Sequence, residues 1–407
     1  MPILIPFFTL LLLGTACKEA PAKPVFRPDT ARLAETDTLS KPVTDSTQVP
    51  KPYQSIVHYK TEKLKAAPGT KSVVFNSRGN HLYAMNLEGM SVYEFERKSR
   101  KLVREFRFRP TKGTGWDYAS SRPISSFQEK PVEACFSHDD QLLWISLHNA
   151  DGIVALRLDS LSANPDKSFK GAKLKTVYVT RPGSAGRDSL YIPLIHTGKT
   201  PKVITRTADS RHLLVSNWHS YSVSVLELDA GRPPFGKVIA TLPLGDIPRG
   251  MAVDEKNTKS FIAIMGGSTI VRVDNNTWKT DSVIQVRNSP RHIVMDSSGH
   301  LFVSYNSIGY VACLDARNGQ QLFSIKTPAQ PRTIALSKNH RFLFVTCYTS
   351  DLVDVYKIHP DKFEKVASLP CEGHPVGVDI YEDDDTLEAW VCSYKKGEIQ
   401  IYSFRKK

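Results

Sequence analysis

A short pattern recurs through most of the 407-residue chain. Each copy has a proline, usually followed by a basic residue, then an apolar stretch, a polar turn and a second apolar stretch. The three clearest copies follow one another at intervals of roughly 40 residues, a spacing typical of repeat architectures. The copies begin at Thr70, Pro131, Pro201, Pro248, Pro290, Pro331 and Pro375. Seven equivalent units of this size bury their faces against one another, because one unit alone cannot.

The apolar runs inside each copy have the length and composition of β-strands. In the copy that begins at Pro290, residues 301–305, 309–315 and 321–325 are rich in β-branched and aromatic side chains and are separated by turn residues. These runs lack the i, i+3 and i+4 apolar spacing that helical repeats need. A period near 40 residues that contains only strands is typical of a propeller with one four-stranded blade per copy. The sequence therefore predicts an all-β fold, a seven-bladed β-propeller.

The last copy is too short to supply a whole blade. It begins at Pro375 and is one strand short when the chain ends at Lys407. Residues 54–59 precede the first copy and alternate in the manner of a strand. We expect this segment to complete the last blade and close the ring, so the propeller is expected to span residues 53–407.

The N-terminal residues indicate export. Residues 1–16 are apolar, end in small residues and directly precede Cys17, a pattern that resembles a bacterial lipoprotein signal peptide. A plain secretory signal is the alternative. Residues 17–52 contain few large apolar side chains and are expected to form a flexible tether. The expected localisation is the bacterial cell envelope, with the chain anchored to a membrane through lipidated Cys17.

Basic residues occupy one position of the repeat. The formal charge is +13, and the residue after the repeat proline is Lys202, Arg249, Arg291 and Arg332 in four consecutive copies, with Lys71 in the first. Copies two and seven have valine, Val132 and Val376, at this position. The innermost strand of a blade begins here, so the cations are expected to surround the central channel and bind an anion. Alternatively, each arginine bonds a carbonyl of the next blade or a carboxylate such as Glu133 or Asp246.

Polar and aromatic residues end the second strand of each copy and are expected at the same rim. An aromatic face beside a guanidinium group can hold a planar ring or a sugar with negative charge. Packing between blades is the alternative role. The candidate ligand-binding residues are Lys202, Arg249, Arg291, Arg332, His148, Asn217, Trp218, His219, Asn306, Tyr348 and Tyr394. The glycines of the 265–267 segment are expected to open space or to bring backbone N–H groups close to a ligand.

Two long insertions precede repeat prolines. Residues 109–130, which include Trp116, lie before the second repeat proline, and residues 183–200 lie before the third. Both are expected as long loops on the rim with the basic residues, where such loops shape binding surfaces.

Signals for catalysis, metals and cofactors are weak. The sequence has no zincin, nucleophile-elbow or Walker motif and no haem-attachment motif, so catalytic residues are unassigned and we expect no metal and no cofactor. His148, His219, His292 and His374 are interpreted as hydrogen-bonded structural residues, or as groups that approach the axis. Apart from Cys17, the five cysteines mostly lie inside strand runs and are expected to act as small buried hydrophobes.

Several phrases of the sequence resemble a known family. Residues 310–316, 343–346 and 373–378 are similar to repeats of the YVTN β-propeller family, YncE-like, within the wider WD40-like group. The resemblance covers about residues 54–404 and implies a propeller fold. For bacterial exported members it implies a binding or scaffold role at the envelope. The first copy departs from the pattern because it lacks the proline.

Three functions follow as expectations. The preferred one is an envelope propeller whose basic rim binds an anionic small molecule or glycan, or an envelope protein partner. A nucleic acid is a less favoured partner, and a monomer is expected. The second is a propeller lactonase-like hydrolase, which needs a close carboxylate–histidine pair at the channel mouth. The third is a redox-linked quinoprotein-type propeller, which the missing attachment motif disfavours.

Overall fold

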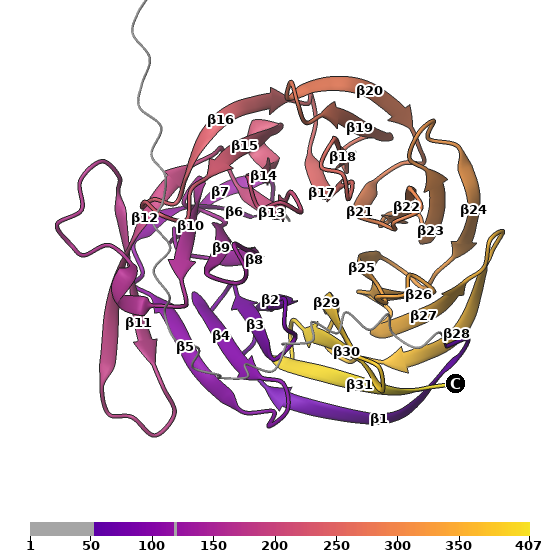
Figure 1. Ribbon diagram of the computed structural model, residues 1–407, viewed down its shortest axis with the longest axis horizontal. Coiled ribbons are helices and arrows are strands. Elements are labelled where there is room, and N and C mark those ends of the chain that lie inside the picture. Colours follow the sequence, from indigo (N-terminus) through magenta and orange to yellow (C-terminus); the bar gives the residue numbers. More distant parts are fainter. Residues whose placement is uncertain (1–52, 118–119) are drawn as a thin grey trace, which may run out of the picture. The chain divides into compact units, whose positions relative to one another are not determined.

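The computed structural model describes residues 53–117 and 120–407. The predicted signal peptide (1–16), the predicted tether (17–52) and the predicted lipidation site Cys17 lie outside the described residues. The described chain is built of β-sheets arranged in a ring (Figure 1). No helix of the described residues has the length and apolar character needed to cross a bilayer.

Four sheets follow one plan, in which consecutive antiparallel strands are neighbours. The first contains β13 (Pro201–Arg206), β14 (His212–Asn217), β15 (Ser222–Leu228) and β16 (Gly236–Pro243). The second contains β17 (Pro248–Val253), β18 (Lys259–Ile264), β19 (Thr269–Asp274) and β20 (Lys279–Gln285). The third contains β21 (Pro290–Met295), β22 (His300–Tyr305), β23 (Tyr310–Asp315) and β24 (Gln321–Lys326). The fourth contains β25 (Pro331–Leu336), β26 (Phe342–Cys347), β27 (Leu352–Ile358) and β28 (Phe363–Pro370).

The strands of the first two repeat copies form one larger sheet. Its order is β2-β3-β4-β5-β11-β12-β10-β9-β8, so β11 joins the strands of the first copy to those of the second. The strands are β2 (Thr70–Phe75), β3 (His81–Asn86), β4 (Ser91–Glu96), β5 (Leu102–Phe108), β8 (Pro131–Ser137), β9 (Leu142–Leu147), β10 (Gly152–Arg157), β11 (Leu174–Thr180) and β12 (Arg187–His196). The remaining short elements are the hairpin strands β6 (Lys112–Asp117) and β7 (Arg122–Phe127) and the 3-10 turns η1 (Leu161–Ala163) and η2 (Trp218–Ser220).

The N-terminal strand completes the last sheet, as the short last copy predicts. The order of this sheet is β1-β31-β30-β29, and the strands are β1 (Ile56–Lys65), β29 (Pro375–Glu382), β30 (Thr386–Ser393) and β31 (Glu398–Lys406). β1 runs antiparallel to β31, with Ile56 opposite Lys406 and Lys65 opposite Glu398. Pairing the two ends of the described chain in one sheet closes the ring (Figure 1).

The first strand of every copy lies toward the centre of the ring and contacts the first strands on both sides. These strands are β2, β8, β13, β17, β21, β25 and β29. Two glycines show how closely they approach. A Cβ on Gly250 of β17 would lie 2.6 Å from the Cα of His292, and one on Gly377 of β29 would lie 2.8 Å from the Cα of Ser72. Any side chain at either position would push neighbouring inner strands apart.

The hydrophobic core lies between adjacent sheets. One cluster packs Val73 and Phe75 of β2 against Trp390 of β30, and another packs Phe302 of β22 against Leu343 and Tyr356 of the next sheet. Both faces of each sheet are therefore buried, which explains why the middle strands are apolar along their whole length. Among the described residues the five cysteines are free, and all except the half-buried Cys135 are buried, as the sequence predicts.

Candidate functional site

A register shift positions the residue after each repeat proline. In β13, β17, β21 and β25 the repeat proline pairs with the end of the second strand, and the register then shifts before regular pairing resumes two or three residues later. An irregularity of this kind frees one residue from the ladder and redirects its side chain. The residues released in this way are Lys202, Arg249, Arg291 and Arg332, and β2 has the same shift beside Lys71.

Hydroxyl groups from the preceding repeat copy hold the backbone at this position. The Oγ of Ser146 donates to the carbonyl of Lys202 at 2.7 Å, and the Oγ of Ser304 donates to the carbonyl of Arg332 at 2.8 Å. Similar bonds reach the carbonyl of Val132 from Ser72 and that of Val376 from Thr346. The backbone carbonyls of these inner-strand residues thus accept hydrogen bonds from the neighbouring copy. The charged ends of their side chains take no part in these bonds and can point toward the axis.

Four of these cations line one cavity of about 340 Å³. Among the described residues, its lining contains no carboxylate. The lining residues are Lys71, Lys202, Trp218, Arg291, Arg332, Tyr348, Val376 and Tyr394. The structure therefore brings together cations from separate repeats, as the basic-ring hypothesis requires.

Arg249 lies behind this lining and forms an ion pair with a carboxylate. Its Nη2 is 3.2 Å from Oε1 of Glu133, and its side chain is 5 % exposed. Within the part of the chain that the structure describes, Nε and Nη1 of Arg249 and Nε of Arg332 are buried without a hydrogen-bond partner. Arg291 is 8 % exposed, and its Nη1 contacts the sulfur of Met265 at 3.3 Å. Pairing of an arginine with Glu133 is one of the alternatives that the sequence leaves open, and the structure shows this pairing for Arg249.

The cations of the cluster lower the pKa values of their neighbours. Burial, and then the charges of Arg249, Arg291 and Arg332, lower the pKa of Lys71 from its usual value to about 7. Burial and the neighbouring cations likewise lower the pKa of Lys202 and of Arg291 well below their usual values. Burial lowers the pKa of Arg332 to about 10. All four shifts oppose positive charge, so a bound anion would relieve them.

The aromatic residues of the rim already contact protein cations. Nζ of Lys202 lies 4.3 Å from the centre of the Trp218 ring, and the guanidinium of Arg249 lies 5.6 Å from it. Arg332 lies 3.4 Å from the ring centre of Tyr348, whose ring is also 4.4 Å from that of His374. Trp218 and Tyr348 therefore help to hold the cations, and the expected open platform for a planar ring is not what these two residues form.

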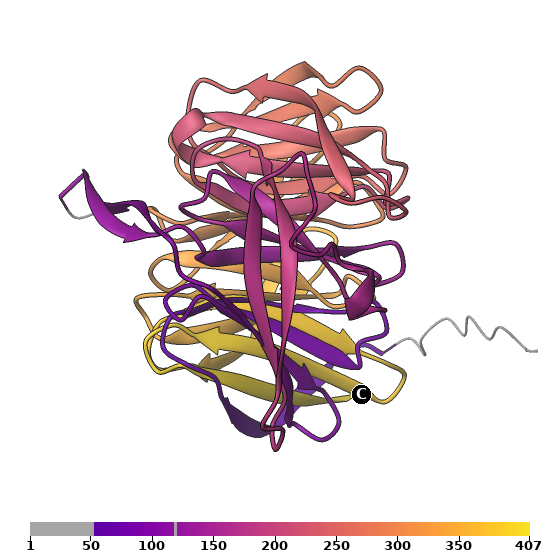
Figure 2. The ribbon, with the colours of Figure 1, turned by 90° about the vertical axis from the view of Figure 1, so that its left-hand side faces the viewer.

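The insertion before the second repeat proline forms a wall beside the cavity. Residues 112–117 and 122–127 form the paired strands of the β6–β7 hairpin, which stands out from one face of the ring (Figure 2). The ring of Trp116 lies 5.2 Å from that of His219, and Nδ2 of Asn149 donates to Oγ of Ser126 and to the carbonyl of Phe127. The base of the hairpin is fixed by a buried ion pair of 2.5 Å between Lys175 and Glu129. The prediction that this insertion shapes the basic rim is thus consistent with the contacts.

A second cavity of about 460 Å³ lies between the hairpin and the ring. Its lining shares Lys71, Lys202 and Tyr394 with the first cavity. The other lining residues are Leu87, Glu88, Gly115, Trp116, Asp117, Ile124, Ser126, Lys130, His148 and Asn149. We call the first the axial cavity and the second the hairpin cavity.

Several predicted site residues have other positions. The side chain of Asn217 is fully buried, and its Nδ2 donates to Ser222 and Ser224, so it ties a turn and lines neither cavity. Asn306 also lines neither cavity. His219 bonds Thr200 at 2.7 Å and contacts the hairpin. His148 lines the hairpin cavity beside Asn149, and burial lowers its pKa well below the usual value.

The expectation for residues 183–200 is wrong over most of that range. Residues 187–196 are strand β12, which pairs with both β10 and β11 instead of forming a rim loop. The expectation for the 265–267 segment is also corrected. A Cβ on Gly266 would lie 1.9 Å from Oδ1 of Asp246, so this glycine makes room for a carboxylate of its own chain. Asp246 therefore contacts the glycine turn and not one of the arginines.

Two residues of the site had no motif in the sequence. Lys130 and Glu88 form an ion pair of 2.9 Å at the edge of the hairpin cavity, and the hydroxyl of Tyr394 donates to Glu88 at 3.1 Å. Lys130 directly precedes a repeat proline, which is the one signal that could have marked it.

The remaining histidines pair within the protein. His374 bonds Asp351 at 3.1 Å, but this carboxylate also accepts the backbone N–H of His374, and neither residue lines the two cavities. His292 is half-buried between inner strands and accepts the backbone N–H of Ile334 at 3.4 Å, and desolvation lowers its pKa to about 3. The histidine that does line a cavity, His148, bonds an amide. The carboxylate–histidine pair that the hydrolase alternative needs is thus not found in the described lining of either cavity.

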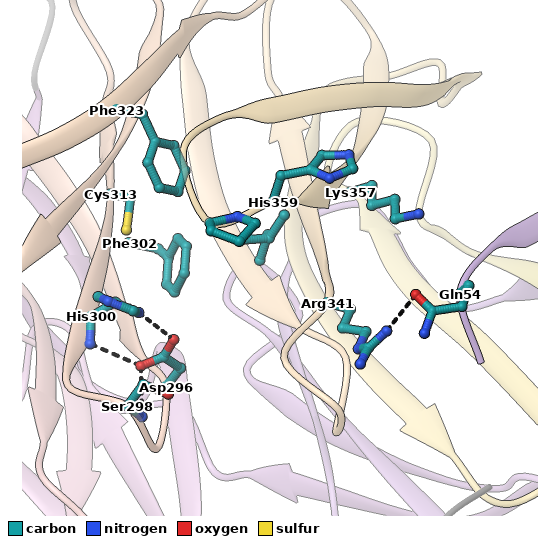
Figure 3. A pocket seen from close by; sticks show the side chains of 12 residues that line it. Gln54, Asp296, Ser298, His300, Phe302, Cys313, Phe323, Arg341, Lys357 and His359 are labelled. Atoms are coloured by element: carbon teal, nitrogen blue, oxygen red, sulfur yellow. Dashed lines mark hydrogen bonds and ion pairs between the residues drawn. The ribbon is translucent and has the colours of Figure 1, made fainter. Parts of the chain in front are cut away.

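A further cavity of about 400 Å³ lies between the sheet of β21–β24 and the sheet of β25–β28, near the other ends of these strands (Figure 3). We call it the intersheet groove. Nδ1 of His300 bonds Asp296 at 2.9 Å, Nη1 of Arg341 donates to Gln54 at 2.6 Å, and Nε2 of His359 bonds Glu364 at 2.7 Å. These polar groups satisfy one another, so the groove makes a weaker candidate than the axial cavity.

Solved structures share the fold of this chain. No protein-family model and no curated protein sequence matches it. A hydrazine synthase chain of Kuenenia stuttgartiensis superposes with a TM-score of 0.62 at 13 % identity, over 88 % of this chain and 97 % of that chain. Virginiamycin B lyase of Staphylococcus aureus superposes with a TM-score of 0.58 at 13 % identity, over 87 % of this chain and 100 % of that chain. At this identity the likeness extends to the fold alone, and it establishes that the chain folds as a β-propeller.

Proposed function

We propose that the protein binds a small anion in the axial cavity. The observation that carries the proposal is a cavity lined by Lys71, Lys202, Arg291 and Arg332, with Arg249 behind it and with Glu133 as the carboxylate that pairs within the cluster. Burying like charges together costs free energy unless an opposite charge compensates them. An anion supplies that charge and accepts hydrogen bonds from guanidinium nitrogens that the fold leaves without partners.

The wider setting of this function is also a proposal. The seven repeat copies support seven blades, with the nine-stranded sheet containing two of them joined through β11. The resemblance to the YVTN family supports an exported binding or scaffold protein. Lipidation of Cys17 would anchor the chain in the bacterial envelope, where it would act as a monomer. An acidic segment of an envelope protein is the alternative occupant of the rim.

Calorimetric titration of the purified protein with sulfate, phosphate and citrate at low salt tests the proposal. We expect at least one of these anions to bind, and the affinity to fall as salt rises, because the contacts are between charges. Arg291→Gln removes a cation of the cavity, and Arg341→Gln makes the same change in the intersheet groove as a matched control. Absence of binding by all three anions, or equal affinities for the two variants, would overturn the proposal.

A further inference from the structure

The two cavities on the basic rim adjoin each other. Their linings share three residues, so a ligand seated in one touches the wall of the other. The shared residues are Lys71, Lys202 and Tyr394. Volumes of about 340 and 460 Å³ are each within the range of about 300–1,000 Å³ that is usual for small-molecule sites. A ligand larger than an inorganic ion therefore has room to extend from the axis toward the hairpin.

The two cavities differ in charge. Every charged residue that lines the axial cavity is a cation. The hairpin cavity adds Glu88 and Asp117 to its cations, and Glu88 is already paired with Lys130. The two carboxylates in this lining disfavour further negative charge in the hairpin cavity. The negative charge of a ligand that fills both cavities is thus confined to the end at the axis.

The hairpin cavity presents the groups that bind hydroxyls. Glu88 and Asp117 offer acceptors, Ser126 and Asn149 offer both donors and acceptors, and Trp116 offers an indole beside them. Hydrogen-bond donors and acceptors next to an aromatic side chain suit a ligand that is rich in hydroxyl groups. A polyphosphate would carry charge past the two carboxylates. A nucleobase would need a ring face, but the rings of Trp218 and Tyr348 contact cations and that of Trp116 contacts His219.

We propose that the ligand is an acidic saccharide, with a phosphate or carboxylate in the axial cavity and its hydroxyl-bearing ring in the hairpin cavity. This proposal rests on the anion-binding function proposed above and adds that the uncharged part of the ligand is a sugar ring. The charged group contacts Arg291, Arg332, Lys71 and Lys202, and the sugar hydroxyls contact the hairpin cavity. Specificity then resides in the hairpin, because the axial cations accept any anion of suitable size.

Titration with matched probes tests this assignment. The probes are glucose 6-phosphate, glucuronate, inorganic phosphate, acetate and glucose, at equal ionic strength. We expect each acidic sugar to bind about tenfold or more tightly than the bare anion that has the same charged group, equivalent to about 1.4 kcal/mol. Glucose alone is expected to bind weakly, because it lacks the charge. The comparison of glucose 6-phosphate with glucuronate distinguishes phosphate from carboxylate as the charged end.

A pair of neighbouring substitutions locates the sugar. Ser126→Leu places a bulky apolar group in the hairpin cavity, whereas Ser125→Leu makes the same change one residue away, on the other face of β7, outside the lining. Ser126→Leu should reduce the affinity for glucose 6-phosphate to that for phosphate and leave phosphate binding unchanged. Ser125→Leu should change neither affinity.

The outcomes separate this inference from the proposed function. If phosphate binds, but acidic sugars bind no tighter or are unaffected by Ser126→Leu, the anion site stands and the saccharide assignment is overturned. If neither bare anions nor acidic sugars bind, both proposals are overturned. Circular dichroism of both serine variants checks that the sheet signal is retained. Should Ser126→Leu fail to fold, Trp116→Ala replaces it, with the same expected loss confined to the acidic sugars.

Discussion

The axial cavity and the intersheet groove differ in how their polar groups are satisfied. In the groove, the histidines and Arg341 each have a hydrogen-bond partner from the chain itself (Figure 3). In the axial cluster Arg249 pairs with Glu133 and still retains buried nitrogens without partners. Both hollows have similar volumes, about 400 and 340 Å³. Cavity size therefore does not distinguish a binding site from a packing gap, whereas unmet hydrogen bonding and charge do.

The strongest test of this contrast removes the charge of the axial cluster. Replacing Arg249, Arg291 and Arg332 together with Gln should lower the affinity for sulfate at least about a hundredfold, because three charge-assisted contacts are lost. The paired control in the groove, Arg341→Gln with Lys357→Gln, should leave the affinity unchanged. Calorimetry measures binding and circular dichroism checks the fold. An unchanged affinity of the triple variant would mean that the anion binds elsewhere.

Removal of the negative charge of Glu133 should raise the affinity for anions. Glu133→Gln leaves the guanidinium of Arg249, whose side chain is 5 % exposed, without its ion pair. We expect the free energy of unfolding to fall by about 2 kcal/mol, because a buried cation loses its partner. Sulfate should bind roughly tenfold more tightly and restore the stability by mass action. Urea unfolding with and without sulfate measures both effects. If sulfate fails to restore stability, Glu133 has a structural role alone.

Anion affinity should depend on pH through Lys71. Its pKa is lowered to about 7, so the side chain is charged below that pH and neutral above it. Sulfate keeps its charge in this range, and we expect its affinity to fall roughly tenfold as pH rises from 6 to 9. Because an unfolded lysine stays protonated to about 10.5, the contribution of Lys71 to folding stability rises over the window from 7 to 10.5. Lys71→Met should remove the dependence of sulfate affinity on pH. If the affinity of this variant still falls as pH rises, another group causes the dependence.

The smallest effect on binding is expected in the groove. Asp296 accepts hydrogen bonds from the backbone N–H groups of Ser298 and His300 and from the His300 ring, so Asp296→Ala should cost about 1–2 kcal/mol of stability. Anion affinity should not change. Chemical unfolding and sulfate titration of the same preparation measure the two quantities. A loss of sulfate affinity would show that the groove and the axial cavity are coupled.

Much of the fold could be predicted because its signals are local. Strand alternation and turn residues repeat along the chain, and the short copy at Pro375 required a partner strand that β1 supplies. Residues 187–196 escaped prediction because β12 is an additional strand of the second copy that pairs with β10 and β11, and the pairing of β11 with β5 of the first copy leaves no local signal. The cations were recognised by their fixed place after the proline. The roles of Trp218 and Tyr348 could not be recognised from the sequence, because ring contacts with cations depend on neighbours from other sheets.

The sequence by itself determined the strand repeat, the closing strand and the line of basic residues, since each depends on the spacing of residues within or between copies. The tertiary structure alone decided that these cations converge, that Glu133 pairs with Arg249, and that the β6–β7 hairpin lines an adjoining cavity. The physical reason is closure of the ring. Residues roughly 40 positions apart become neighbours only when the inner strands meet around the axis, and electrostatic interaction depends on that distance and burial, not on separation along the chain.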